Sequence, residues 1–191
     1  MKKSIVFEYE SSIVAISKYD DFPLTDTKFL TGLDELLGKL DLKCGISMSF
    51  SNFMNLKYYY IQSKLALSEG FEKDSQPLHY YYGDYFLDHL LHSLDNSTSM
   101  RSLCHPKILE LKEYDNNNDS NSVECLFEYL LNGRNNSMTA KKLHIHRNTL
   151  MYRINKILEF IAMDLNDERT MLHVLFSCII VNYLNDSYIL F

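Results

Sequence analysis

The last third of the chain repeats its apolar residues at helical spacing, and this pattern limits the possible folds more than any other feature of the sequence. Between positions 123 and 131, apolar side chains stand at i, i+3, i+4, i+7 and i+8, namely Val123, Leu126, Phe127, Leu130 and Leu131. Residues with that spacing line one face of an amphipathic helix. The same kind of pattern predicts further helices at 137–143, 147–161 and 168–184. We therefore expect an all-helical C-terminal segment.

The first half of the chain predicts mixed α and β structure. Runs of β-branched and aromatic residues predict strands at 4–9 and 13–17, joined as a hairpin, and further strands at 42–50 and 78–82. Helical spacing predicts helices at 25–40 (with Thr25 or Asp26 as N-cap), at 52–67 (closed by Gly70), at 85–94 and at 105–114. The 191 residues include only 6 Gly and 3 Pro, which favours helices over a many-turned β architecture. Together the two halves predict the fold class α+β.

A run of eight Asn, Asp and Ser residues, from Asp115 to Ser122, separates the two segments. These residue types compete with the helical backbone for hydrogen bonds and cannot build an apolar core. The run therefore predicts a linker. The expected organisation is a first domain at 1–95, a connecting helix and linker at 96–122, and a helical domain at 123–191.

The charge of the chain is unevenly distributed. The net charge is −6, from 19 basic and 25 acidic residues, and a charge of that sign disfavours a nucleic-acid partner. The window from Arg134 to Lys156, however, carries six basic residues and no acidic one, so the rest of the chain carries −12. One basic segment on an acidic body indicates where an anionic partner would bind.

The sequence indicates neither secretion nor a membrane. The four cysteines form no CxxC pair, which excludes a zinc ribbon and argues against a disulfide scaffold; they are Cys44, Cys104, Cys125 and Cys178. The first residues lack the apolar stretch of a signal peptide, and the most apolar run, 171–184, is shorter than the roughly 18–20 residues of a membrane span. His89 and His92 lie one turn apart, with Asp88 as the only adjacent acidic ligand and no Cys to complete a metal site. We therefore expect a cytoplasmic protein with no metal and no other cofactor.

The helices at 137–143 and 147–161, joined by His144-Ile145-His146, have the dimensions of a helix-turn-helix. Ala140 is small enough for two helices to cross closely, and Leu143 and Ile145 would fill the core between them. A stripe of apolar residues marks the buried face of the second helix: Leu150, Ile154, Ile157, Leu158 and Ile161. The alternative is a solvated basic helix in an ordinary helical bundle.

The opposite face of the second helix is polar, uncharged apart from its basic edges, and suited to the major groove. At about 100° per residue it presents Asn148, Tyr152 and Asn155, with Arg147 at the helix start. Asn side chains can pair with adenine and Arg with guanine, so these four are the predicted base-reading residues. The predicted phosphate contacts are Arg134, Lys141, Lys142, His146, Thr149 and Lys156.

The run from Thr139 to Ile154, and His-Arg-Asn-Thr-Leu-x-Tyr-Arg at 146–153 above all, resembles the C-terminal helix-turn-helix of the PucR/CdaR family of bacterial transcriptional regulators. Residues 126–133 resemble the helix that leads into it, and His105-Pro106 with Tyr114-Asp115 resembles the helix before that. The family usually has Asp-Pro before its last helix, where this chain has Asn166-Asp167-Glu168. The difference affects the expected local turn rather than the resemblance.

The first segment resembles the middle domain of the same family, a degenerate relative of the GGDEF nucleotide-cyclase fold. The resemblance lies in Cys44-Gly45-Ile46-Ser47 and in the helix from Leu56 to Gly70. It implies a truncated GGDEF-like α/β domain at 1–95 that begins at the second strand of that fold. The cyclase signature is missing between Phe7 and Ile13, so we expect no cyclase activity and no enzyme.

These observations predict a sequence-specific DNA-binding transcriptional regulator that places helix 147–161 in the major groove of double-stranded DNA. The last helix is apolar on most sides, which suggests a homodimer. The alternative is a protein-interaction or dimerisation module of a truncated regulator that binds no operator of its own. The sequence shows no pocket for an effector ligand.

Overall fold

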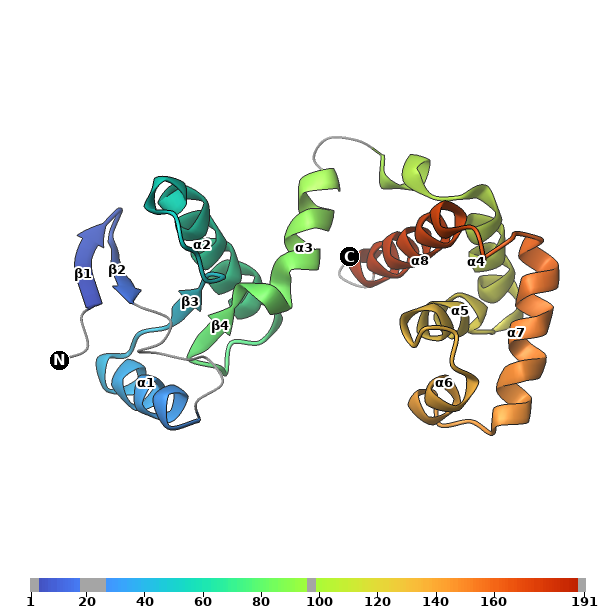
Figure 1. Ribbon diagram of the computed structural model, residues 1–191, viewed down its shortest axis with the longest axis horizontal. Helices are drawn as coiled ribbons and strands as arrows, with labels where there is room; N and C mark the ends of the chain where they lie inside the picture. Colours follow the sequence, from blue (N-terminus) through green and yellow to red (C-terminus); the bar gives the residue numbers. More distant parts are fainter. Residues whose placement is uncertain (1–3, 18–26, 96–98, 189–191) are drawn as a thin grey trace. The chain divides into compact units, whose positions relative to one another are not determined.

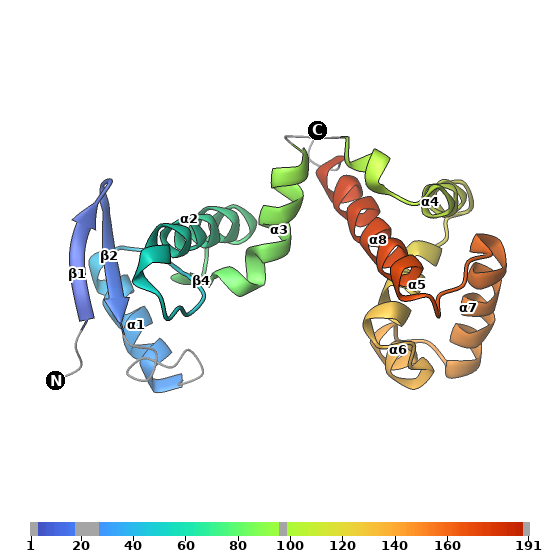
Figure 2. The same ribbon diagram turned by 45° about the horizontal axis from the view of Figure 1, so that its top comes forward.

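The computed structural model describes residues 4–17, 27–95 and 99–188, and the chain divides into two compact units, Met1–Leu90 and Leu91–Phe191 (Figures 1 and 2). The first unit holds β1 (Ser4–Tyr9), β2 (Ser12–Ser17), α1 (Thr27–Leu40), β3 (Cys44–Ile46), α2 (Leu56–Lys73) and β4 (His79–Tyr81). A short 3₁₀ helix, Phe53–Asn55, precedes α2. Helix α3 (Tyr82–Asp95) runs across the division. The predicted caps Thr25 and Asp26 lie outside the described residues.

The second unit is all helical among its described residues. After a 3₁₀ turn at Met100–Leu103 come α4 (Pro106–Asn118), α5 (Ser122–Leu131), α6 (Asn136–Lys142), α7 (Arg147–Ile161) and α8 (Glu168–Tyr188). The mixed first segment and the helical second segment were both predicted from the sequence. The GGDEF-like identity of the first segment remains a prediction.

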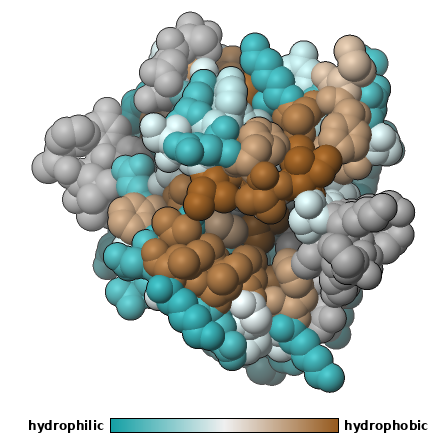
Figure 3. Space-filling view, turned by 90° about the vertical axis from the view of Figure 1, so that its left-hand side faces the viewer, coloured by the Kyte–Doolittle hydropathy of each residue, from teal (hydrophilic) through white to brown (hydrophobic). Residues whose placement is uncertain are grey.

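The predicted hairpin at the start of the chain is confirmed. β1 and β2 pair antiparallel from Ser4 opposite Ser17 to Tyr9 opposite Ser12. The hairpin contacts α2 through Tyr9, whose ring meets Tyr60 edge to face at 5.2 Å. Its outward side chains stay uncovered in this unit, where Val6 and Ile13 are 61% and 66% exposed. Figure 3 shows apolar side chains gathered on this face of the first unit.

β3, α2 and β4 form a β-α-β arrangement in which the two strands are parallel, with Gly45 opposite Tyr80. The strand predicted at 42–50 is shorter than expected, because beyond Ile46 the Met48 backbone N–H donates to the side chain of Gln62 instead of to a strand. The prediction that Gly70 closes the preceding helix is wrong. α2 continues to Lys73, and Gly70 is buried inside it. This position needs a glycine because a Cβ there would lie 2.2 Å from the Tyr80 ring.

The predicted linker at Asp115–Ser122 is corrected by the structure. α4 continues through Asn118, and only Asp119 to Asn121 separate it from α5. Asp115 explains the difference, because its buried carboxylate accepts hydrogen bonds from the Ser120 hydroxyl and from the N–H groups of Ser122 and Val123. These bonds cap the start of α5 from the end of α4. The two units divide between Leu90 and Leu91, before this segment.

One continuous apolar core holds the second unit together. Its fully buried side chains come from α4, α5, α7 and α8, among them Ile108, Leu126, Leu150 and Val174. α8 was predicted to end at Leu184 and extends to Tyr188. It begins at Glu168, one residue after Asp167, whose carboxylate accepts the N–H of Thr170. Hydrogen bonds from the side chain and the N–H of Thr170 lower the pKa of Asp167 below its usual value. Asp167 thus supplies the turn that the missing proline put in question.

Candidate DNA interface

α6 is the first helix of the predicted helix-turn-helix, and it begins one residue before the predicted start. The side chain of Asn135 accepts the N–H groups of Ser137 and Met138 at 3.0 and 3.1 Å. Asn135 has the extended backbone of a cap, whereas Ser137 already lies in the first turn of α6.

The connection from α6 to α7 runs from Leu143 to His146, one residue longer than the predicted His144-Ile145-His146. Leu143 is the C-cap of α6, His144 takes a left-handed backbone (φ 53°), and the Ile145 N–H donates to the Ala140 carbonyl at 3.0 Å. His146 caps α7, because its Nδ1 accepts the Asn148 N–H at 3.2 Å. An imidazole that accepts at Nδ1 carries its proton on Nε2 when neutral. That N–H can donate to a phosphate oxygen.

The inner face of α7 is buried as predicted, apart from Leu158, which is only partly buried. Leu150 is fully buried, and Ile154, Ile157 and Ile161 are each less than 5% exposed. Ala140 on α6 is also buried, at 5%. Because these residues pack α7 against α5 and α6, the opposite face of α7 has a fixed direction relative to the turn (Figure 1).

The outer face of α7 carries the predicted base-reading residues, and all of them are exposed: Arg147, Asn148, Tyr152 and Asn155. Asn148, Tyr152 and Asn155 follow at i, i+4 and i+7, one above the other. Within the part of the chain that the structure describes, no protein group hydrogen-bonds the amide side chain of Asn148 or Asn155. Their donors and acceptors are therefore open to a partner.

Lys156 lies beside Tyr152 on this face. Its ammonium is 4.6 Å from the centroid of the Tyr152 ring, in a cation–π contact. A hydrogen bond and electrostatic attraction to Tyr152 raise the pKa of Lys156 above its usual value. The sequence predicted Lys156 as a phosphate contact but gave no sign of this pairing.

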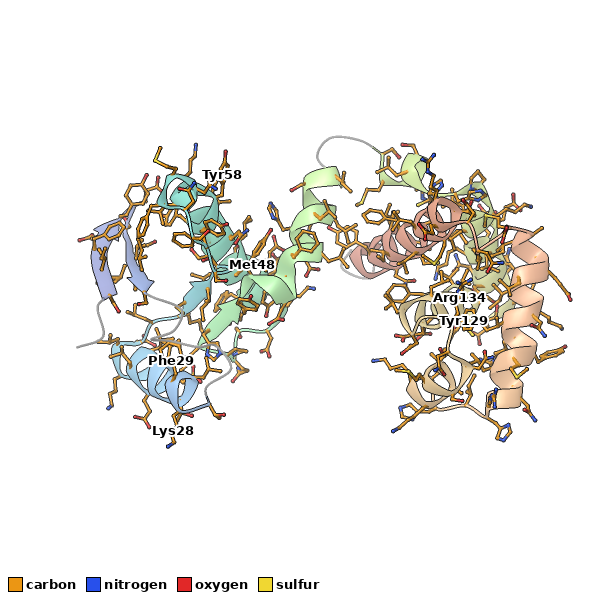
Figure 4. The ribbon with its side chains drawn as sticks, in the orientation of Figure 1. Lys28, Phe29, Met48, Tyr58, Tyr129 and Arg134 are labelled. Atoms are coloured by element: carbon orange, nitrogen blue, oxygen red, sulfur yellow. The ribbon has the colours of Figure 1, made fainter. Side chains whose placement is uncertain are left out.

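Most of the other predicted phosphate contacts are exposed around the turn. Lys141 and Lys142 end α6, and Thr149 lies in the first turn of α7. Arg134 is engaged elsewhere. Its guanidinium donates to the Leu165 carbonyl at 3.2 Å and to Asn166 Oδ1 at 3.0 Å, next to Tyr129 (Figure 4).

Those bonds give Arg134 a structural part, since they connect the turn after α5 to the loop before α8. Its contact with phosphate stays a prediction, as do the roles of the other residues at this surface. Sequence reasoning also missed the caps at Asp115 and Asn135. The signal available for each cap was an Asp or Asn ahead of a helical pattern. Asn135 directly precedes α6, and Asp115 lies seven residues before the start of α5.

Some titratable groups outside this surface are buried or hydrogen-bonded within the fold. Burial raises the pKa of the Cys125 thiol to about 11 and that of Cys178 to about 12, so both stay protonated near neutral pH. His89 Nδ1 forms a hydrogen bond with the Tyr82 hydroxyl.

No group of three or more possible metal ligands occurs among the residues that the structure describes. In the same described ranges, no helix is long and apolar enough to cross a membrane.

Comparison with known proteins supports the helix-turn-helix assignment. Residues 122–180 match the PucR C-terminal helix-turn-helix domain. The chain is 30% identical over 139 residues to the carbohydrate diacid regulator of Escherichia coli (strain K12), a match that covers 72% of this chain and 35% of the relative. No solved structure matches the chain significantly.

Two Bacillus subtilis (strain 168) proteins are also similar. The proline-responsive transcriptional activator PutR is 26% identical, over 66% of this chain and 31% of its own length. The DNA-binding transcriptional activator AdeR is 25% identical, over 81% of this chain and 38% of its own length. The chain thus spans about a third of the length of these relatives. Residues 122–180 form a PucR-type C-terminal helix-turn-helix domain, in a chain related to bacterial transcriptional regulators.

Proposed function

We propose that this protein is a sequence-specific DNA-binding transcriptional regulator of the cytoplasm that places α7 in the major groove of its operator. One observation carries the proposal: from Arg147 to Lys156, α7 presents an exposed row of polar residues, free of acidic side chains, above a buried apolar stripe. A recognition helix needs that division, because one face must be held rigidly while the other meets the bases.

The residues of this surface divide by chemistry. Asn148 and Asn155 carry amides that can pair with adenine through two hydrogen bonds, Arg147 can do the same with guanine, and Tyr152 offers a hydroxyl. Phosphate is bound by cationic and hydroxyl groups at the edges, which position the protein without reading sequence: Lys141, Lys142, His146, Thr149 and Lys156, with Arg134 placed less favourably.

The acidic character of the rest of the chain supports a specific rather than a general DNA binder. The segment from Arg134 to Lys156 carries +6, while the remaining residues carry −12. Counter-ion release from the basic segment supplies salt-dependent affinity, and the acidic body repels DNA elsewhere. We expect weak binding to random duplexes at physiological salt.

We further propose that the regulator acts as a homodimer on two half-sites about 34 Å apart, or a multiple of that distance. α8 supports this. Leu172 is 59% exposed, and Leu175, Phe176 and Ile179 are only partly buried although one face of α8 already closes the core of the second unit. Sedimentation at micromolar concentration is expected to show a dimer, and a monomer throughout would contradict the proposal.

A salt-titrated binding assay tests the DNA-binding function. Duplexes selected from a random pool are compared with unselected duplexes, using the full chain and single variants. Asn148→Ala and Asn155→Ala are each expected to lose about 1–3 kcal/mol of preference for the selected duplex. Lys141→Ala is expected to weaken binding to every sequence and to flatten the dependence on salt.

Two results would contradict this function. If no duplex is preferred over the random pool at any salt concentration, the chain is better described as a protein-interaction module without its own operator. If Lys141→Ala instead changed sequence preference and left overall affinity intact, the division into base-reading and phosphate-binding residues would be wrong.

A further inference from the structure

Two residues of the recognition face contact each other. Tyr152 is 59% exposed, yet the Lys156 ammonium lies over its ring, 4.6 Å from the centroid. The two are one helical turn apart. Helical side chains tilt toward the N-terminus, so the longer Lys156 side chain reaches back over the turn that bears Tyr152.

We propose that Lys156 is a positioning residue for Tyr152: its ammonium holds the ring in one rotamer, so that the hydroxyl meets a single base position in the groove. This inference rests on the proposed function and refines it. Lys156 then contributes to sequence preference as well as to general affinity for phosphate.

An exposed tyrosine has little else to fix its direction. The buried stripe of α7 lies on the other side of the helix, and Tyr152 belongs to none of the packed clusters of the second unit. A base-reading side chain that samples several rotamers loses entropy when it binds, whereas one already held in place loses less. The cation above the ring supplies that restraint.

Lys141 provides a matched comparison. It is an exposed cation at the same helix-turn-helix, on α6. In the part of the chain that the structure describes, no aromatic ring lies beneath its ammonium. A substitution at Lys141 therefore removes charge alone, whereas one at Lys156 removes charge and frees Tyr152.

The first measurement is the ratio of dissociation constants for random and selected duplexes, made with the full chain at fixed salt. Lys156→Met keeps the alkyl chain and removes the charge, and we expect it to lower this ratio about two- to fivefold, the range for an exposed cation–π contact. Lys156→Arg keeps a cation over the ring and is expected to retain the ratio. Lys141→Met is expected to weaken both complexes equally.

The second measurement needs no DNA. Three-bond couplings of labelled tyrosine report the χ1 rotamer of Tyr152 in the free protein. We expect one dominant rotamer in the wild type and in Lys156→Arg, and averaging in Lys156→Met. Since both side chains are exposed, the far-UV circular dichroism and the thermal midpoint should be the same in all variants.

Each outcome decides the matter. If Lys156→Met weakens both complexes equally, or leaves the Tyr152 rotamer unchanged, Lys156 is only a phosphate contact and the proposal is overturned. A wild-type protein without any sequence preference overturns the proposed function itself, and that failure is visible before any variant is compared.

Discussion

The buried carboxylate of Asp115 holds two successive helices together. It is 4% exposed and accepts three hydrogen bonds, two of them from the first N–H groups of α5. Asp115→Ala leaves those donors without a partner in a buried place. Because each hydrogen bond to a charged group contributes about 1.5–3 kcal/mol, we expect the second unit to lose at least about 3 kcal/mol, measured by urea denaturation.

A control for Asp115→Ala lies on the same helix. Glu113 is exposed on α4, and Glu113→Ala is expected to change the free energy of unfolding by less than about 0.5 kcal/mol. Asp115→Asn should fall between the two, because an amide keeps one acceptor oxygen and loses the other. Equal stability of Asp115→Ala and Glu113→Ala would show that α5 needs no cap from α4.

At the scale of elements, the close approach of β3 to α2 makes Gly45 the most demanding backbone position of the first unit. A Cβ on Gly45 would lie 1.8 Å from the Ser63 carbonyl oxygen, and a backbone atom of a helix cannot move aside easily. We expect Gly45→Ala to separate β3 from α2 and to destabilise the first unit by on the order of 3 kcal/mol. Hydrogen exchange resolved by peptide would locate the loss.

Gly32 is the matched comparison for Gly45. It lies inside α1, and a Cβ there meets no atom within 4 Å. Gly32→Ala is therefore expected to slow exchange in α1, because alanine stabilises an exposed helix by about 0.5–1 kcal/mol relative to glycine. If both alanines had the same effect, the packing of β3 on α2 would not limit stability.

The helices with a clear apolar stripe were predictable from the sequence, whereas the positions where helices end were less predictable. Spacing alone places α7 at Arg147–Ile161, since the buried residues repeat without interruption. At Gly70 and from Asp115 to Asn118 the sequence predicted the end of a helix where the helix continues, and both errors have the same reason. Glycine and asparagine disfavour helix locally, but here contacts with Tyr80 and Val123 override that preference.

The candidate site shows the same limit. The outer face of α7 follows from its helical period, so the sequence alone is enough to place Asn148, Tyr152 and Asn155 together. The position of Arg134 does not follow from the sequence, because its partners Leu165 and Asn166 lie some thirty residues later in the chain. A sequence pattern reports the neighbours along a helix and not the loops that pack against it.

At the scale of the whole molecule, the two units differ in how much core they hold. The second unit has one large buried cluster that draws on the 3₁₀ turn and on α4 to α8. The first unit holds a much smaller one, centred on Ala66, Tyr80 and Tyr82. Since stability grows with the apolar area removed from water, the first unit is expected to be the less stable of the two.

The second unit should therefore fold and read DNA by itself. All the proposed base-reading residues and phosphate contacts, and the core that supports them, lie within Leu91–Phe191. Residues 91–191 alone are expected to unfold in one cooperative transition and to prefer the same selected duplex as the full chain. Removing residues 1–90 also removes a net charge of −4, so affinity for random duplexes should rise slightly at low salt. A fragment that folds cooperatively but prefers a different sequence would show that the first unit shapes the recognition surface.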